Sequence, residues 1–114
     1  MATAKPSVKV ILSFAAADEL REIWRYNAEH RSLEKADRYD GFLKENIRGL
    51  ATEYSEGFPV VGFPEFRYLT CKRSRRGDGH YLTYETDVEA GIVVVLHVFH
   101  TKMDVLGRLA DDLA

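Results

Sequence analysis

The densest run of hydrophobic residues lies near the carboxyl end of the chain, in the segment GIVVVLHVFHTKMD (residues 91–104). It begins at a turn glycine, is apolar at both odd and even positions, and ends in a cluster of polar residues. This pattern, rich in β-branched residues, is typical of a strand with both faces buried. A short buried helix has a similar periodicity, but the β-branched content and the preceding turn at residues 89–91 favour a strand. The segment therefore predicts the central strand of a sheet.

Two segments in the first half of the chain have the hydrophobic spacing of amphipathic helices. After a short apolar strand at residues 9–14, a helix is expected from Ser13 or a neighbour to near His30. A second helix is expected to start at Ser32, whose side chain can cap free amide groups. Since only one or two residues separate the segments, they must form an antiparallel hairpin. The apolar stripe of the second helix is Ala36, Tyr39, Leu43, Ile47, Leu50 and Tyr54.

The second half of the chain has the pattern of strands and turns. Glycine and proline are concentrated in residues 55–65, which are expected to form a loop. Strands are expected at residues 66–72 and 80–86, joined by a hairpin loop, and a short closing helix is expected at residues 103–113. The sequence thus predicts an α+β fold with an N-terminal β-strand, an antiparallel two-helix hairpin, a three-strand antiparallel meander and a short C-terminal helix.

Length and composition indicate one ordinary globular domain. The 114 residues predict a single domain at residues 8–114 behind a flexible leader at residues 1–7. No apolar run approaches the roughly 20 residues that span a bilayer, and the leader lacks a signal-peptide core. We therefore expect a cytoplasmic protein without a membrane partner. Cys71 is the only cysteine, so no internal disulfide can form, and we expect it to be a small buried hydrophobic residue.

The charged residues are unevenly distributed, although the formal net charge is only −2. From residue 67 to residue 80, five basic residues stand against one acid, whereas from residue 81 onward six acids stand against two bases. A local basic patch on a mildly acidic body fits one defined anionic partner better than general binding of nucleic acid. The alternative is that these basic residues bind no partner and only keep an exposed hairpin loop solvated. The basic residues are Arg67, Lys72, Arg73, Arg75 and Arg76.

Histidines extend this basic patch into a candidate reactive site. Arginine binds phosphate in a bidentate manner and histidine can give or take a proton near neutral pH, so these residue types could form a metal-free ribonuclease. His97 and His100 are three residues apart, so on a strand they point to opposite faces, and one of them is expected to be structural. The whole set is Arg67, Lys72, Arg73, Arg75, Arg76, His80, His97, His100 and Lys102.

Other kinds of site are not indicated by the sequence. The histidines lack HExxH or paired-cysteine spacing, so neither a metal site nor a cofactor is expected. The segment Gly77-Asp78-Gly79 fits a tight turn better than a phosphate loop or a nucleophile elbow. The aromatic residues of the strands could stack on bases, but pairing across strands in the core is their commoner role. These residues are Phe66, Tyr68, Tyr81, Tyr84 and Phe99.

Five segments, taken together, resemble a known family. They are ILSFAAADELREIWRY (11–26), SLEKAD (32–37), LATEYSEGFPVVGFPEFRYL (50–69), GHYLTYE (79–85) and VVVLHVFHTKMD (93–104). Their order and spacing resemble the RelE/ParE superfamily of bacterial toxin-antitoxin toxins, and most closely its ParE branch, also called plasmid stabilisation proteins. No single segment is specific, but the resemblance covers nearly all of residues 8–106.

The resemblance implies a sheet with an N-terminal helical hairpin, and a toxin that a cognate antitoxin neutralises. ParE-like toxins act on DNA gyrase and block replication, whereas RelE-like relatives cut messenger RNA in the ribosomal A site. The long helices, the ending from His100 to Asp104, and Thr101 in place of the tyrosine of some nucleases favour the ParE branch. Two departures from the ParE pattern are Met103 and His97, both at positions where an arginine is usual.

We therefore expect a toxin that works by binding DNA gyrase and blocking replication, and not by catalysis. In this interpretation the arginines of the basic patch, with Lys72, His97, His100 and Lys102, supply the surface for the target, and residues 103–113 extend it. The antitoxin is expected to lay an amphipathic helix in a groove, and a strand added to an open sheet edge is a second mode of contact.

Two alternatives remain open at this point. The first is a metal-independent endoribonuclease that acts on messenger RNA at the ribosome. In it, His80 or His100 is the general acid or base, and Arg73 and Arg75 hold the scissile phosphate. The second is an interaction module of the same fold without toxicity.

Overall fold

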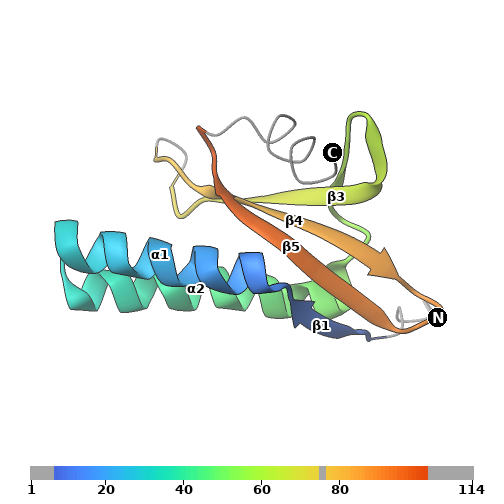
Figure 1. Cartoon of the computed structure of the whole chain (residues 1–114), viewed down its shortest axis with the longest axis horizontal. Helices are drawn as coiled ribbons and strands as arrows, with labels where there is room; N and C mark the ends of the chain where they lie inside the picture. Colours follow the sequence, from blue (N-terminus) through green and yellow to red (C-terminus); the bar gives the residue numbers. More distant parts are fainter. Residues whose placement is uncertain (1–6, 75–76, 103–114) are drawn as a thin grey trace.

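The computed structural model describes residues 7–74 and 77–102. Two helices pack against one face of a five-stranded sheet, which confirms the α+β class (Figure 1). The elements are β1 (Lys9–Leu12), α1 (Phe14–His30), α2 (Leu33–Glu53), β2 (Phe58–Val60), β3 (Phe63–Cys71), β4 (His80–Asp87) and β5 (Ile92–His100). The closing helix expected at residues 103–113 and nearly all of the leader lie outside the described residues.

Serine caps explain where both helices begin. The Ser13 hydroxyl accepts a hydrogen bond from the Ala16 amide at 3.0 Å, and the Ser32 hydroxyl accepts one from the Lys35 amide at 3.1 Å. Each serine satisfies a backbone donor that the first turn of a helix leaves free. The expected end near His30 and the cap at Ser32 are confirmed. The first strand ends at Leu12, earlier than expected, because Ser13 already belongs to the cap.

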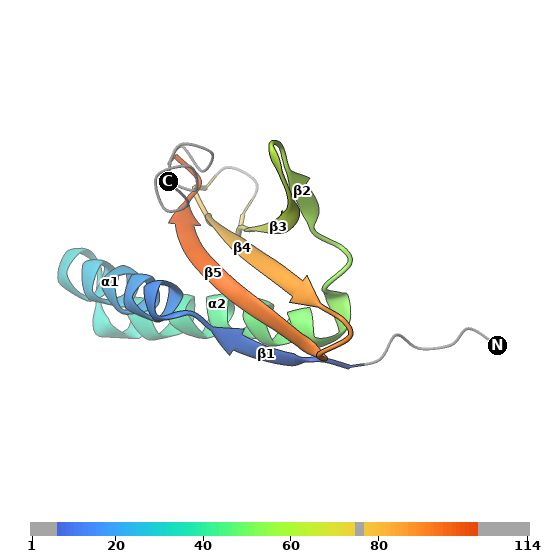
Figure 2. The ribbon, with the colours of Figure 1, turned by 45° about the vertical axis from the view of Figure 1, so that its right-hand side comes forward.

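The strands lie in the order β1-β5-β4-β3-β2 (Figure 2). The strands β3, β4 and β5 form the predicted antiparallel meander, and β1 joins β5 in parallel orientation. The strand β5 is therefore an interior strand, but the middle strand of the sheet is β4. The prediction of a central β5 is wrong by one position because β2 extends the far side of the sheet.

The segment 55–65 is only partly the loop that its glycines and prolines predict. It contains β2 and the start of β3, which pair antiparallel. Pro59 is compatible with β2 because an edge strand can tolerate the missing amide donor. Gly62 makes the turn between the strands with φ +85°, a conformation that favours glycine. Val60 and Phe66 are buried in a small second cluster, which gives this hairpin its own hydrophobic support.

The main core lies between the helices and the sheet. Leu43 and Leu50 of α2 meet Leu82, Val93 and Val95 of the sheet, and all five side chains are fully buried. Burial of an aliphatic side chain of this size contributes about 1.5–3 kcal/mol. The prediction that the apolar stripe of α2 faces the core is therefore confirmed for these leucines. Neither α1 nor α2 combines the length and the hydropathy that crossing a bilayer requires.

Tyr84 is the largest fully buried side chain, and it ties the end of α2 to the sheet. Its hydroxyl donates a hydrogen bond to the Tyr54 carbonyl at 2.8 Å and accepts one from the Gly57 amide at 3.0 Å. A side chain at Gly57 would collide with this hydroxyl, since a Cβ atom would lie 2.1 Å from it. On the other face of the sheet, the rings of Tyr68 and Tyr81 meet edge to face, which is the cross-strand pairing that the sequence predicts.

Candidate functional site

The registers of three strands bring His80 and His100 together at one end of the sheet. Cys71 of β3 pairs with His80 of β4, and His80 pairs with His100 at the end of β5. Asp78 and Lys102 lie just outside these strands, and Tyr39 reaches the same place from α2. We call Tyr39, Asp78, His80, His100 and Lys102 the histidine site.

His80 is the inner member of the histidine site. Its Nδ1 atom lies 2.6 Å from the Tyr39 hydroxyl. A phenol keeps its proton at neutral pH, so Tyr39 donates, Nδ1 accepts, and the ring hydrogen of His80 is on Nε2. Burial, with a smaller effect of His100, lowers the pKa of His80 to about 4. His80 is therefore a neutral imidazole near pH 7.

Tyr39, like His80, is held in its neutral form. Burial raises the pKa of Tyr39 to about 12, with a further increase from Cys71 and an opposing effect of Arg73. Cys71 is buried, as expected from the sequence, and burial raises the pKa of its thiol to about 11. The inner part of the site is thus uncharged at neutral pH, and the charged groups lie around it.

His100 forms the outer, more exposed part of the site. Its ring meets the His80 ring edge to face with centroids 5.3 Å apart, and its Nδ1 accepts a hydrogen bond from the Lys102 amide at 3.2 Å. This leaves the ring hydrogen on Nε2, which lies 4.0 Å from the Asp78 carboxylate. The Lys102 ammonium lies 3.4 Å from the same carboxylate. The His100–Asp78 contact is long and the Lys102–Asp78 ion pair is exposed, so an incoming anion could displace Asp78 at little cost.

A close backbone pairing holds the two chain segments of the site in register. The Thr101 amide donates to the Gly79 carbonyl at 3.0 Å, and the Gly79 amide donates to the Thr101 hydroxyl at 3.2 Å. Gly79 leaves no room for a side chain, because a Cβ atom there would lie 2.2 Å from the Cys71 carbonyl oxygen. Thr101 therefore has a structural role, since it holds Gly79. It stands at the position where some RelE-like nucleases have a tyrosine.

Two residues of the predicted set lie elsewhere. Arg67 lies in the middle of β3, four residues before the position that pairs with His80, and donates a hydrogen bond to the Gly57 carbonyl at 2.6 Å. His97 points to the opposite face from His100, as the spacing predicts, and stacks on Phe99 with ring centroids 4.5 Å apart. Lys72 and Arg73 are exposed beside the histidine site, whereas Arg75 and Arg76 lie outside the described residues.

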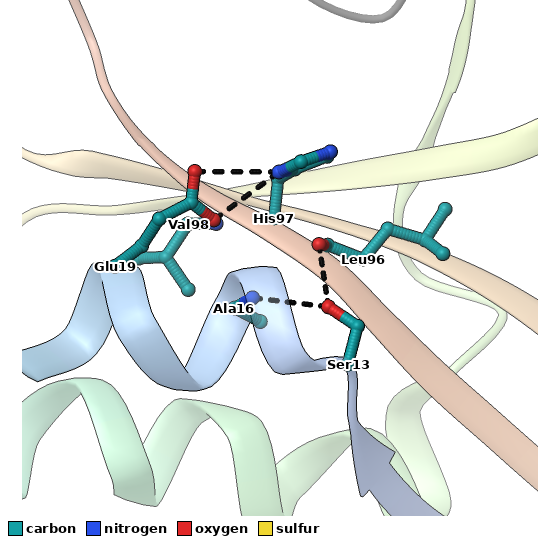
Figure 3. Close-up of polar contacts among 6 residues, drawn as sticks. All are labelled: Ser13, Ala16, Glu19, Leu96, His97 and Val98. Atoms are coloured by element: carbon teal, nitrogen blue, oxygen red, sulfur yellow. Dashed lines mark hydrogen bonds and ion pairs between the residues drawn. The ribbon is translucent and has the colours of Figure 1, made fainter. Parts of the chain in front are cut away.

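A polar contact between α1 and β5 supports the strand that carries His100 (Figure 3). One carboxylate oxygen of Glu19 accepts a hydrogen bond from the Val98 amide at 3.0 Å, and lies 3.2 Å from Nδ1 of His97. The Ser13 hydroxyl donates to the Leu96 carbonyl at 2.7 Å. These side chains bind backbone groups of β5 beyond the point where β1 ends. They fix the last part of β5 against α1.

Sequence reasoning missed Tyr39, Asp78 and Glu19 as parts of this arrangement. Tyr39 was expected only as a core residue of α2, although a buried tyrosine hydroxyl usually finds a hydrogen-bond partner. From this rule alone, the sequence could have predicted that the Tyr39 hydroxyl makes a hydrogen bond, but not with which residue. Within the described part of the chain, no three His, Cys, Asp or Glu side chains are grouped so that they could hold a metal ion.

Comparison with known proteins gives the family. The model described as the ParE toxin of the type II toxin-antitoxin system parDE matches residues 10–105. The chain belongs to the ParE toxin family. This confirms the resemblance to the ParE branch and places the protein among the toxins of type II toxin-antitoxin systems, which implies an antitoxin partner.

The ParE fold is also supported by a solved structure. A chain of the chromosomal ParDE toxin-antitoxin system from P. aeruginosa superposes with a TM-score of 0.70 at 16% sequence identity, over 86% of this chain and 100% of that chain. At this low identity the likeness concerns the fold. A search of curated proteins finds no match.

Proposed function

We propose that this ParE-family toxin inhibits growth by binding DNA gyrase in the cytoplasm and blocking replication, and that its cognate antitoxin neutralises it. The observation that carries the proposal is the neutral, hydrogen-bonded state of His80. An effective general base has a pKa near the working pH. A pKa of about 4, with Nδ1 occupied by Tyr39, makes His80 a poor base and favours binding over catalysis.

The outer part of the histidine site offers hydrogen-bond donors and positive charge. His100 presents an Nε2–H group, and Lys102 and Arg73 are exposed cations beside it. Such a surface fits a carboxylate or phosphate group of the target. His97 and Arg67 are engaged in contacts within the fold, so we assign them positioning roles rather than contacts with the target.

A messenger RNA endoribonuclease is the second candidate, and one observation favours it. His100 is partly exposed beside Lys102, which is an arrangement that could protonate a leaving group and hold a phosphate. In that mechanism Arg73 would be a second phosphate ligand.

Induction of the toxin alone in a bacterium separates the two candidates. DNA and protein synthesis are followed separately by pulse labelling after induction. We expect DNA synthesis to stop first, with filamentation and a DNA damage response, while protein synthesis continues. A prompt stop in translation with messages cut at codons would replace the gyrase proposal by the nuclease. Normal growth would indicate an interaction module.

A further inference from the structure

The hydroxyl of Tyr39 links the helical hairpin to the histidine site. Tyr39 belongs to α2, and its ring packs against Phe42 with centroids 5.7 Å apart and against His80 with centroids 5.5 Å apart. Its hydroxyl oxygen lies 2.6 Å from Nδ1 of His80, a residue of β4 that is 41 positions away in the chain. Because packing holds the Tyr39 ring, the hydroxyl reaches the site from one defined direction.

This hydrogen bond fixes both the tautomer and the rotation of the His80 ring. A neutral imidazole can carry its ring hydrogen on either nitrogen, and the partner of one nitrogen decides the state of the other. Burial keeps Tyr39 protonated, with a pKa of about 12, so its hydroxyl donates to Nδ1 and the hydrogen of His80 stays on Nε2. The lone pair of Nδ1 lies in the ring plane, so the hydrogen bond also restricts rotation of the ring.

His80 in turn supports the ring of His100. The two residues pair across β4 and β5, and their rings meet edge to face at 87° with centroids 5.3 Å apart. Ring contacts of this kind depend on geometry, so a turn of the His80 ring changes the surface on which the His100 ring rests. Two further contacts of His100 are a hydrogen bond from the Lys102 amide and a carboxylate oxygen of Asp78, 4.0 Å from Nε2. Both lie on the outer side of the ring, so His80 is its support from the interior.

We propose that Tyr39 is a positioning residue for target binding: acting through His80, it holds the His100 ring with its Nε2–H group directed to the exposed side of the histidine site. The proposal rests on the function put forward above, in which this site binds the target. The side chains of His100 and Asp78 are 39% and 53% exposed, so a donor that points towards Asp78 is accessible to an anionic group of the target. The hairpin and the sheet therefore build the target-binding site together.

Nuclear magnetic resonance of the full-length toxin tests the effect on the two rings. Long-range proton–nitrogen correlation spectra distinguish protonated from unprotonated ring nitrogens of the four histidines. The variant is Tyr39→Phe, which keeps the ring and removes the hydroxyl. The control is Tyr26→Phe, at a position that is 59% exposed and whose ring stacks on His30.

Near neutral pH we expect wild type to carry the ring hydrogen of both His80 and His100 on Nε2. Tyr39→Phe should give His80 a mixture of tautomers and shift the ring signals of His100. Tyr26→Phe should leave the signals of both rings as in wild type.

Growth inhibition after induction without antitoxin tests the effect on function, whichever target the toxin has. We expect Tyr39→Phe to need about threefold to tenfold more toxin to halve growth, the effect of losing one neutral hydrogen bond, and Tyr26→Phe to match wild type. A double variant tests the route. If Tyr39 acts through His80, Tyr39→Phe should cause no further loss of toxicity in a protein that already carries His80→Phe. Urea denaturation measures the folded fraction of each variant at the growth temperature.

Four results would overturn the positioning role. Unchanged ring signals of His100 in Tyr39→Phe would limit Tyr39 to packing, and a further loss of toxicity in the double variant would mean that it acts by another route than His80. Full toxicity of Tyr39→Phe, or a wild type without toxicity, would show that the ring orientation serves no target. Failure of the gyrase proposal is seen separately, as a stop in translation during pulse labelling, and leaves these results valid.

Discussion

At the residue scale, the contact between Tyr39 and His80 determines what the candidate site can do. The sequence presents the two residues separately, one as a helix core position and the other as a candidate acid or base. They are 41 positions apart, so no local pattern reveals that the hydroxyl reaches Nδ1 at 2.6 Å. The prediction that His97 and His100 face opposite sides needs only strand alternation, and the structure confirms it.

Replacing His80 with glutamine should remove a pH dependence of stability. The unfolded chain protonates this ring near pH 6.5, whereas the folded protein does so only near its lowered pKa of about 4. Protonation therefore favours the unfolded chain, and the stability contributed by neutral His80 is complete above about pH 6.5 and is lost as pH falls towards 4. Allowing for partial exposure of the ring, the loss is on the order of 1–2 kcal/mol.

Urea denaturation of wild type and His80→Gln across this pH range checks the prediction. Glutamine can still accept the Tyr39 hydrogen bond but does not titrate, so its stability should fall less between neutral and acidic pH. Identical pH profiles for the two proteins would show that the pKa of His80 is not lowered.

Tyr84→Phe should destabilise the fold without changing its shape. The variant loses one hydroxyl that satisfies both the Tyr54 carbonyl and the Gly57 amide in a buried location. Leaving buried backbone groups without partners costs about 1–3 kcal/mol. Equilibrium unfolding in urea measures the change, with Tyr26→Phe at an exposed position as the control, which should differ little from wild type. Equal stability of the two variants would contradict the role of the buried hydroxyl.

At the scale of elements, the helix boundaries were predictable because serine caps act on their own first turn. The strand β2 was not predictable, because residues 55–65 are rich in glycine and proline and their composition indicates a loop. Pairing with β3 across the turn at Gly62 nevertheless makes part of this segment a strand. The link between α1 and β5 was equally invisible in the sequence. It depends on Ser13 and Glu19 reaching backbone groups of β5 that lie more than 70 positions away in the chain.

Ser13→Ala should therefore cost more stability than Ser32→Ala. Both variants lose an N-cap, which is worth about 1 kcal/mol. Ser13 also donates to the Leu96 carbonyl, and loss of that hydrogen bond adds about 0.5–1.5 kcal/mol. The difference between the two free energies of unfolding measures the tie between α1 and β5. Equal losses in the two variants would show that the tie contributes nothing.

At the scale of the whole molecule, the sequence indicated the fold class and the family, but neither the sheet order nor the composition of the site. The parallel pairing of β1 with β5 depends on the path of the helical hairpin, which local periodicity does not encode. The basic patch was anticipated as one surface, yet the fold directs Arg67 to the Gly57 carbonyl and His97 to the opposite face. Among the described members of the predicted set, those that lie at the predicted end of the sheet are His80, His100, Lys102, Lys72 and Arg73.

The central claim is that the toxin binds gyrase through the histidine site. Lys102→Glu reverses an exposed charge of this site, and Lys9→Glu makes the same change at the opposite end of β5, where Lys9 pairs with Ile92. Both positions are exposed, so both variants should fold. A loss of activity in the first variant alone would identify the site rather than the net charge as the cause.

The most direct measurement adds purified toxin to gyrase, ATP and supercoiled plasmid, and follows plasmid linearised in trapped cleavage complexes. We expect linear plasmid with wild type and Lys9→Glu, and at least about a tenfold loss with Lys102→Glu, which is the effect of losing one important contact. Absence of linear plasmid at every toxin concentration, together with cut messages when the toxin is added to translating ribosomes, would contradict the account.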